Sequence, residues 1–253
     1  MSVQRSSSHK MLAILDVFTV ERPVATVNEI AAAIEVPRVT AYRYLKTLCD
    51  AGLLLRLGNA DFCLGPRIVQ LDRQIQLSDP LIALSRSAVS ECLSAAPWDA
   101  LLLCSFARDM VLCVHEELRA GSEVRLKRPR GMPFPMFRGP ASQIILAHLP
   151  IARIRELYVQ AIEKADDSPS VLGANLDEVR KSLRAMKRRG YAMSRNEFRT
   201  GLLGVAAPIH DGSGRIVGSI AGVKAQSQLP EGDHPLVRSV VDCAAAITRK
   251  FSA

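Results

Sequence analysis

The fold is decided by the stretch Thr26-Val-Asn-Glu-Ile-Ala-Ala32, followed after a short turn by Val36-Pro-Arg-Val-Thr-Ala-Tyr-Arg-Tyr-Leu-Lys-Thr-Leu-Cys-Asp-Ala-Gly52. Its first four residues form a T-x-x-E capping box, which predicts the start of a helix. Glu35 and Val36 then make a tight turn, and Pro37 suits the first turn of a second helix. We expect that helix to bury Val39, Leu45 and Leu48 and to stop at Ala51-Gly52, because glycine commonly follows a helix end.

The elements on either side of this helix pair complete a known order. Upstream, Met11, Leu12, Ile14, Leu15 and Phe18 have helical spacing, and that helix is expected to end near Glu21-Arg22-Pro23. Downstream, the apolar runs 53–55 and 62–64 flank a turn-rich segment and predict a small β-hairpin. Helix, capped helix, tight turn, helix and hairpin is the order of a winged helix-turn-helix.

The second helix of the pair carries the candidate DNA-binding residues. Its polar side presents Arg38, Thr40, Tyr42, Arg43 and Lys46, with no acid before Asp50. We expect Arg38 and Thr40 to reach base edges, Arg43 and Lys46 to bind phosphates, and Arg56 in the hairpin to touch the neighbouring backbone. Three cations on an isolated amphipathic helix are more often a solvated face. The complete four-element order favours DNA binding here.

The remainder of the chain predicts a linker helix and a second domain. Gly65-Pro66 closes the first unit, and an amphipathic helix then runs to a break at Asp79-Pro80. Beyond it, helices are expected at 81–95, 144–149, 151–162, 176–189 and 235–251, and strands at 101–106, 111–114, 124–126, 205–210 and 216–223. We therefore expect an α+β chain with a DNA-binding domain at 1–65, a linker at 66–79 and a second domain at 80–253.

Several of these segments carry a family resemblance. Thr26–Ala32 with Val36–Gly52 resembles the helix-turn-helix of the IclR family of bacterial transcription regulators, and Phe62-Cys-Leu-Gly-Pro66 resembles the exit of its wing. Further on, Arg189-Gly-Tyr-Ala192, Glu197, Gly201, Val205-Ala-Ala-Pro208 and Gly214-Arg215 resemble its effector domain. Two departures stand out. Ala141-Ser142-Gln143 replaces a small residue followed by Gly-Lys, and Glu35 stands where the family often has glycine.

The resemblance implies a fold, partners and a ligand site. The fold is a winged helix-turn-helix, a linker helix and a GAF-like effector domain with an antiparallel sheet; the partners are double-stranded DNA at palindromic operators and further copies of the chain, as a homodimer or a dimer of dimers. The effector is expected to be a small organic acid. Its expected contacts are Phe134, Met136, Arg138, Ser142, Gln143, Leu203, Val205, Ala221 and Val223. The alternative is that Phe134–Phe137 merely packs a loop and Arg138 is solvated.

Composition and net charge narrow the classes of protein to which the chain can belong. The chain has 253 residues, a hydrophobic fraction of 48% and a net charge of +8, and no apolar run approaches the ~18 residues of a membrane span. No signal peptide is apparent, which predicts a cytoplasmic protein. Residues 1–77 hold only 9 of the 33 cations, against 7 acids, so the charge sum is poor support for DNA binding. The position of the cations on one helix supports it better.

No motif predicts catalysis, a cofactor or a metal site. A metal site would need a fourth ligand at a suitable spacing from Cys104, Cys113 and His115, and the sequence offers none. Packing of these side chains in the core is the favoured interpretation. Six scattered cysteines without a C-x-x-C pair predict free, mostly buried thiols. The alternative function is a GAF-like cysteine redox enzyme or thiol sensor, which requires an accessible cysteine of low pKa.

Overall fold

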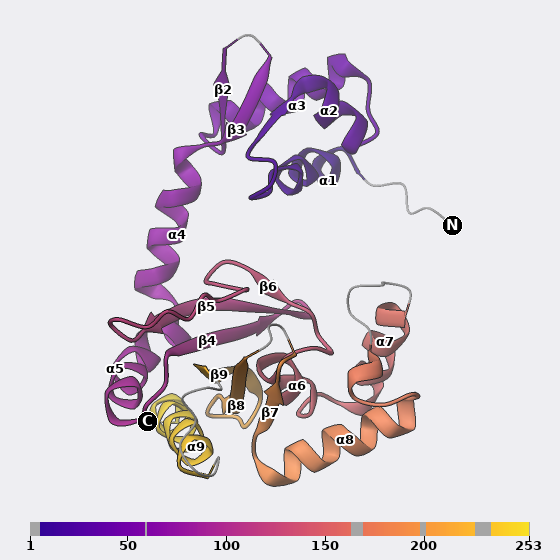
Figure 1. Cartoon of the computed structure of the whole chain (residues 1–253). Helices are drawn as coiled ribbons and strands as arrows, with labels where there is room; N and C mark the ends of the chain where they lie inside the picture. The colour runs from indigo at the N-terminus through magenta and orange to yellow at the C-terminus, as the bar shows by residue number, and fades with distance from the viewer. Residues whose placement is uncertain (1–5, 59, 163–168, 198–200, 226–233, 253) are drawn as a thin grey trace. The chain divides into compact units, whose positions relative to one another are not determined.

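The computed structural model describes residues 6–58, 60–162, 169–197, 201–225 and 234–252. The chain divides into two compact units, Met1–Ser78 (unit 1) and Asp79–Ala253 (unit 2), whose elements Figure 1 labels along the chain. Among the helices in these described ranges, none is both long and apolar enough to cross a membrane.

Unit 1 is a winged helix-turn-helix followed by a long helix. Its elements are α1 (Ser7–Leu12), the 3-10 helix η1 (Ala13–Val17), β1 (Val24–Thr26), α2 (Val27–Ala33), α3 (Arg38–Asp50), β2 (Leu54–Leu57), β3 (Asp61–Leu64) and α4 (Pro66–Ser78). The strands form an antiparallel sheet in the order β1-β3-β2, so the predicted hairpin gains a third strand. The first helix is shorter than predicted, since its last turn narrows to η1 and ends at Val17.

The capping box and the turn hold α2 and α3 in place. The backbone N–H of Glu29 donates to Thr26 Oγ1 at 3.3 Å, and that of Thr26 donates to Glu29 Oε2 at 2.7 Å. The hydrogen bonds from Thr26 lower the pKa of Glu29. In the turn, Glu35 has a φ of 53°, which is the left-handed conformation that favours glycine. Lys10 Nζ donates to the carbonyl oxygen of Glu35 at 3.0 Å and so ties α1 to this turn.

The buried face of α3 shares Leu45 and Leu48 with the predicted one and differs from it at Val39, Ala41 and Tyr44. Ala41, Tyr44, Leu45 and Leu48 are buried at spacings of three and four residues. The prediction that Val39 is buried was wrong, because Val39 is 81% exposed. It lies off the stripe that begins at Ala41, so it shares the solvent side of the helix.

Unit 2 is built on one antiparallel sheet of six strands. The strands are β4 (Ala100–Ala107), β5 (Met110–Leu118), β6 (Pro133–Phe134), β7 (Ala192–Arg195), β8 (Leu202–His210) and β9 (Ile216–Ala225). Their order is β6-β5-β4-β9-β8-β7, with β8 and β9 forming the predicted hairpin. Residues 124–126, predicted as a strand, lie instead in the irregular β5–β6 connection, and the short strands β6 and β7 were not predicted.

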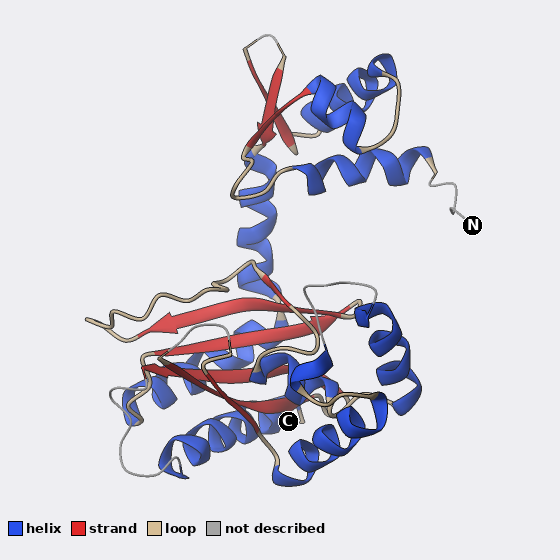
Figure 2. Ribbon diagram, turned by 45° about the vertical axis from the view of Figure 1, so that its right-hand side comes forward, coloured by secondary structure: helices blue, strands red, loops and turns tan. Residues whose placement is uncertain are grey.

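Helices cover both faces of this sheet (Figure 2). One face, here the α5/α9 face, packs against α5 (Pro80–Ala95) and α9 (His234–Phe251). The other, here the α6 face, packs against α6 (Pro140–Leu146), α7 (Ile151–Ile162) and α8 (Leu176–Arg189), while the 3-10 helix η3 (Pro169–Val171) contacts α7. Leu103 and Ile220 pair across β4 and β9 toward the α5/α9 face, whereas the next pair, Leu102 and Ala221, belongs to the α6 face. The two cores therefore use alternate residues of the same strands.

Candidate functional site

The exposed side of α3 gathers the cations of unit 1. Arg38, Tyr42, Arg43 and Lys46 are exposed, and Thr40 is half-buried. The guanidinium of Arg38 donates to Tyr42 Oη at 3.3 Å and lies 5.5 Å from the centre of its ring. These contacts orient an arginine at the N-terminal end of α3 without covering its remaining donors. All five predicted side chains of this helix are thus presented together on one surface.

The neighbouring residues support that surface. Arg43 lies 5.7 Å from the ring of Tyr44, whose hydroxyl is 2.6 Å from Ser7 Oγ. The buried Tyr44 therefore anchors α3 to α1 while Arg43 extends outward from it. Arg56 lies exposed on β2 of the hairpin. The arrangement presents cations on both the helix and the wing, which is what a backbone-contacting surface requires.

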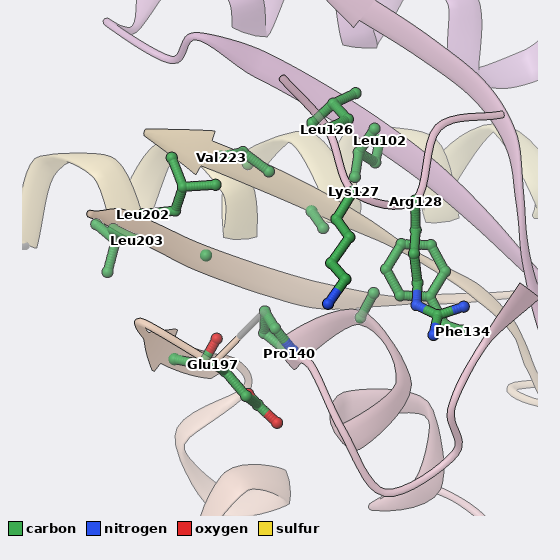
Figure 3. Close-up of a pocket in the computed structure, with 15 residues that line it drawn as sticks. Leu102, Leu126, Lys127, Arg128, Phe134, Pro140, Glu197, Leu202, Leu203 and Val223 are labelled. Atoms are coloured by element: carbon green, nitrogen blue, oxygen red, sulfur yellow. The ribbon is translucent and has the colours of Figure 1, made fainter. Parts of the chain in front are cut away.

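A pocket opens on the α6 face of unit 2 (Figure 3). Its space measures about 610 Å³, part of which is open to solvent. Apolar side chains form most of the wall, and they come from strands β4, β6, β8 and β9, the β5–β6 connection and the start of α6: Leu102, Leu126, Phe134, Pro140, Ala141, Leu202, Ala221 and Val223. A mostly apolar hollow with a few polar groups is typical of a small-molecule site.

Glycine at position 204 shapes one side of this pocket. A Cβ atom at Gly204 would lie 2.9 Å from Pro140 Cγ. The absence of a side chain therefore allows the start of α6 to pack directly on β8. That close approach brings Pro140 and Ala141 to the pocket wall.

The polar groups of the pocket lie at its edges. Lys127 and Arg128 enter from the β5–β6 connection, and Glu197 lies on the other side near Pro140 (Figure 3). The carboxylate oxygen Oε1 of Glu197 accepts hydrogen bonds from the backbone N–H of Gly139 at 2.7 Å and from Gln143 Nε2 at 3.2 Å. Arg138 donates to the backbone carbonyl of Glu197 at 3.0 Å. Glu197 thus fastens the segment after β7 to the start of α6.

Comparisons with known proteins find a family match in each unit of the chain. The IclR helix-turn-helix domain matches residues 9–58, and the bacterial transcriptional regulator IclR C-terminal domain matches residues 90–249. The chain belongs to the IclR family. It is accordingly a transcriptional regulator with a DNA-binding helix-turn-helix and a C-terminal effector domain.

Individual IclR relatives cover nearly the whole chain. The HTH-type transcriptional regulator KipR of Bacillus subtilis is 21% identical over 243 residues, covering 96% of this chain and 95% of its own. The structure of an IclR regulator from Alicyclobacillus acidocaldarius matches with a TM-score of 0.79 at 20% identity and covers 98% of each chain. An IclR homologue from Microbacterium hydrocarbonoxydans, solved with 4-hydroxybenzoate, matches with a TM-score of 0.75 at 18% identity, covering 97% of this chain and 99% of its own.

The residues that the IclR resemblance assigned to the effector site line this pocket only in part. Phe134, Ala221 and Val223 line it as expected. Val205 does not, because it is an odd-numbered residue of β8 whose side chain is buried in the α5/α9 core. The side chain of Leu203 lies in that same core, although the residue also borders the pocket. The even-numbered neighbours Leu202 and Gly204 take the places predicted for them.

The remaining predicted effector residues surround the pocket without lining it. Met136 and Ser142 are buried, and Ser142 Oγ has no hydrogen-bond partner in the described part of the chain. Gln143 is buried and holds Phe137 and Glu197 through its amide. Arg138 holds the backbone of Glu197. These side chains support the pocket wall from behind.

Sequence reasoning missed the residues of the β5–β6 connection. Leu126 ended a segment predicted as a strand, and Lys127 and Arg128, which follow it, were assigned no role. A signal was present, since residues 125–130 hold four cations in six positions and no acid. The pocket itself requires β4, β8 and β9 to be paired, and this pairing is not visible in any local pattern.

The cysteines do not favour the alternative of a redox enzyme or thiol sensor. Cys92, Cys104, Cys113 and Cys243 are buried, and Cys49 and Cys63 are half-buried. A hydrogen bond with Cys113 and burial both raise the pKa of Cys104, the opposite of what a reactive thiol requires. Cys104 pairs with Cys113 across β4 and β5, while His115 pairs with Leu103 and lies 3.2 Å from Glu117. Among the residues described, no group of three metal-ligating side chains comes together.

Proposed function

We propose that this IclR-family regulator binds a palindromic operator through α3 and the wing, and that a small organic acid held in the pocket of unit 2 controls this binding. The observation that carries the first part is the exposed cationic surface of α3. The second part is supported by the apolar pocket with cations at its edge. A carboxylate is the natural counterpart of such a pocket, because its charge meets the cations while its carbon skeleton is buried.

The DNA contacts are assigned by position on α3. Arg38 and Thr40 lie near its N-terminal end and are proposed to read base edges, with Tyr42 beside them. Arg43 and Lys46 lie further along the exposed side and are proposed to bind phosphates. Arg56 on β2 is proposed to bind the backbone next to the site. Arg38→Ala is expected to weaken binding and relax sequence preference, whereas Arg43→Ala weakens it for every sequence.

Fluorescence anisotropy with a promoter fragment from the protein's own locus tests the DNA surface. The wild-type chain is expected to bind with an affinity that falls steeply with salt. Arg43→Ala should reduce the slope of log K against log salt by about one for each bound chain, because one phosphate contact is lost in each half-site. Lys181→Ala, which removes an exposed cation from α8, is the matched control and should leave the slope unchanged. Salt-insensitive binding, or an unaltered Arg43→Ala variant, refutes the assignment.

An organic acid is proposed as the effector because the pocket combines apolar walls with cations. A homologue of the same fold was solved with 4-hydroxybenzoate, which is an aromatic carboxylic acid. Phe134, Ala221 and Val223 are the sequence-predicted residues proposed to touch the ligand. Calorimetric titration with a panel of small carboxylic acids tests this proposal. The absence of binding by every acid in the panel refutes it.

A homodimer or dimer of dimers is proposed because a palindrome presents two equivalent half-sites. Helix α4 has no buried residue in unit 1 and exposes Val69, Ile75 and Leu77. Apolar side chains displayed along a helix are typical of a surface that another chain covers. Light scattering on the purified chain is expected to give a mass of two or four chains. A monomer at micromolar concentration contradicts this proposal.

A further inference from the structure

The segment 125–130, with the sequence Arg-Leu-Lys-Arg-Pro-Arg, places a cation over the pocket. Its neighbours hold it in position. The side chain of Leu126 packs against the core of the α6 face, and the guanidinium of Arg128 donates to the carbonyl oxygen of Pro133. Arg130 Nε donates to the carbonyl oxygen of Val114 at 2.9 Å. The backbone on both sides of Lys127 is therefore anchored.

Lys127 itself is directed differently from its anchored neighbours. Figure 3 shows its side chain extending from the connection across the pocket, with Nζ toward Pro140 at the start of α6. Within the described residues it makes no hydrogen bond and no ion pair. The nearby carboxylate of Glu197 is already bound by Gly139 and Gln143. The ammonium group thus has three donors to offer to an anion at the mouth of the pocket.

The floor below Lys127 is mostly apolar. The sheet turns Leu102, Leu202, Gly204, Ala221 and Val223 toward the pocket, and its edge strand β7 adds the hydroxyl of Ser194. A hydroxyl-rich ligand placed on the apolar side chains of this floor would lose hydrogen bonds to water that these side chains cannot replace, which costs free energy for each buried group left unpaired. An apolar body would instead bury its surface favourably against these residues.

We propose that Lys127 is the anion-binding residue of this pocket and that the effector is a monocarboxylic acid with an apolar body. The carboxylate lies at the solvent-facing side beside Lys127, and the apolar body lies on the sheet between Phe134 and Val223. This inference rests on the proposed function, since it names the chemical class and one contact of the proposed acid effector. It replaces Arg138, whose guanidinium is engaged with the backbone of Glu197, as the expected carboxylate ligand.

Calorimetric titration of the full-length chain with benzoate, benzamide and gluconate tests the proposal. Benzoate has the apolar body and the charge, benzamide lacks the charge, and gluconate has the charge on a hydroxylated body. We expect wild type to bind benzoate at least about tenfold more tightly than either of the others, because a charge-assisted hydrogen bond and apolar burial are each worth that much.

Variants at Lys127 locate the anion. Lys127→Gln should weaken benzoate binding by about tenfold, and Lys127→Arg should restore most of it. Lys181→Gln removes the same charge from the exposed side of α8 and should leave benzoate binding unchanged. Lys127 is exposed, so both substitutions at this position are expected to fold normally.

Each contrary result has a separate meaning. Equal benzoate affinity in Lys127→Gln and wild type overturns the role of Lys127. Benzamide binding as tightly as benzoate overturns the anion, and gluconate binding as tightly overturns the apolar body. Failure of benzoate and the wider panel of acids to bind wild type refutes the acid effector itself, and this inference falls with it.

Discussion

The two faces of the unit 2 sheet are built from alternate residues of the same strands, yet one is packed solid and the other is hollow. On the α5/α9 face, Leu103, Val205 and Ile220 are fully buried against two long helices. On the α6 face, Gly204, Ala221 and Val223 leave space under the β5–β6 connection. Large side chains at one set of alternate positions stabilise the sheet, and small side chains at the other set leave room for a ligand.

The difference also separates two kinds of mutational effect. A substitution on the packed face removes stabilising contacts and lowers the free energy of unfolding. A substitution on the hollow face changes the shape of the pocket and is expected to affect ligand affinity more than stability. Trp98, the single tryptophan of the chain, is fully buried on the packed face against Gly222. Its fluorescence reports the unfolding of unit 2 alone, so the stability of this unit can be measured in the full-length chain.

The largest effect is expected from Leu103→Ala on the packed face. Removing this side chain should lower the free energy of unfolding of unit 2 by about 2–5 kcal/mol, because it leaves a cavity among well-packed neighbours. Urea titration followed by Trp98 fluorescence measures the loss. Benzoate affinity below the unfolding transition should be unchanged. A loss of benzoate affinity without a loss of stability would invert the assignment of the two faces.

A smaller effect is expected from Val223→Trp on the hollow face. The larger side chain should occupy the pocket and weaken benzoate binding by roughly tenfold or more, because the indole ring and the ligand cannot fill the same space. The urea midpoint should move little, because the added ring enters existing space. Calorimetry and the same fluorescence titration give the two values. An unaltered benzoate affinity would show that the acid binds elsewhere.

The smallest effect concerns the acid sensitivity of the end of α6. The rings of His148 and His210 lie 5.0 Å apart, and burial lowers the pKa of both from 6.5, with Lys187 contributing to each. The folded state thus binds fewer protons than the unfolded state, so stability is full above pH 6.5 and falls as pH drops through the lowered pKa values.

Urea titrations between pH 7.5 and 5.5 measure this dependence. Wild type should lose stability across the range, and the double variant His148→Gln, His210→Gln should lose less. His9, which is exposed in α1, offers a control: His9→Gln should keep the wild-type dependence. Identical pH profiles for wild type and the double variant would remove this histidine pair as the cause.

The sequence predicts the exposed cationic side of α3 well because that side lies on one helix. The spacing of Ala41, Tyr44, Leu45 and Leu48 sets the buried side of α3, and the exposed cations follow from it. Leu45 and Leu48 were predicted on that side, Val39 was misplaced, and Ala41 and Tyr44 were not predicted. The capping box of Thr26 and Glu29 is likewise local, and the structure confirms it.

The pocket could be predicted only in part because its walls come from distant segments. A shift of one residue along β8 moves a side chain to the other face, which is why Val205 was placed in the pocket instead of Gly204. The position of Lys127 depends on where Leu126 and Arg128 are anchored, and those contacts arise only when the sheet has formed.

The central claim is that an acid in the pocket of unit 2 controls DNA binding by α3. Anisotropy of the promoter fragment measured with and without benzoate, at ionic strength matched with sodium chloride, tests it most directly. We predict that benzoate changes the apparent DNA affinity of wild type and leaves that of Val223→Trp unchanged. No change in wild type under saturating benzoate, or an equal change in Val223→Trp, would contradict the account.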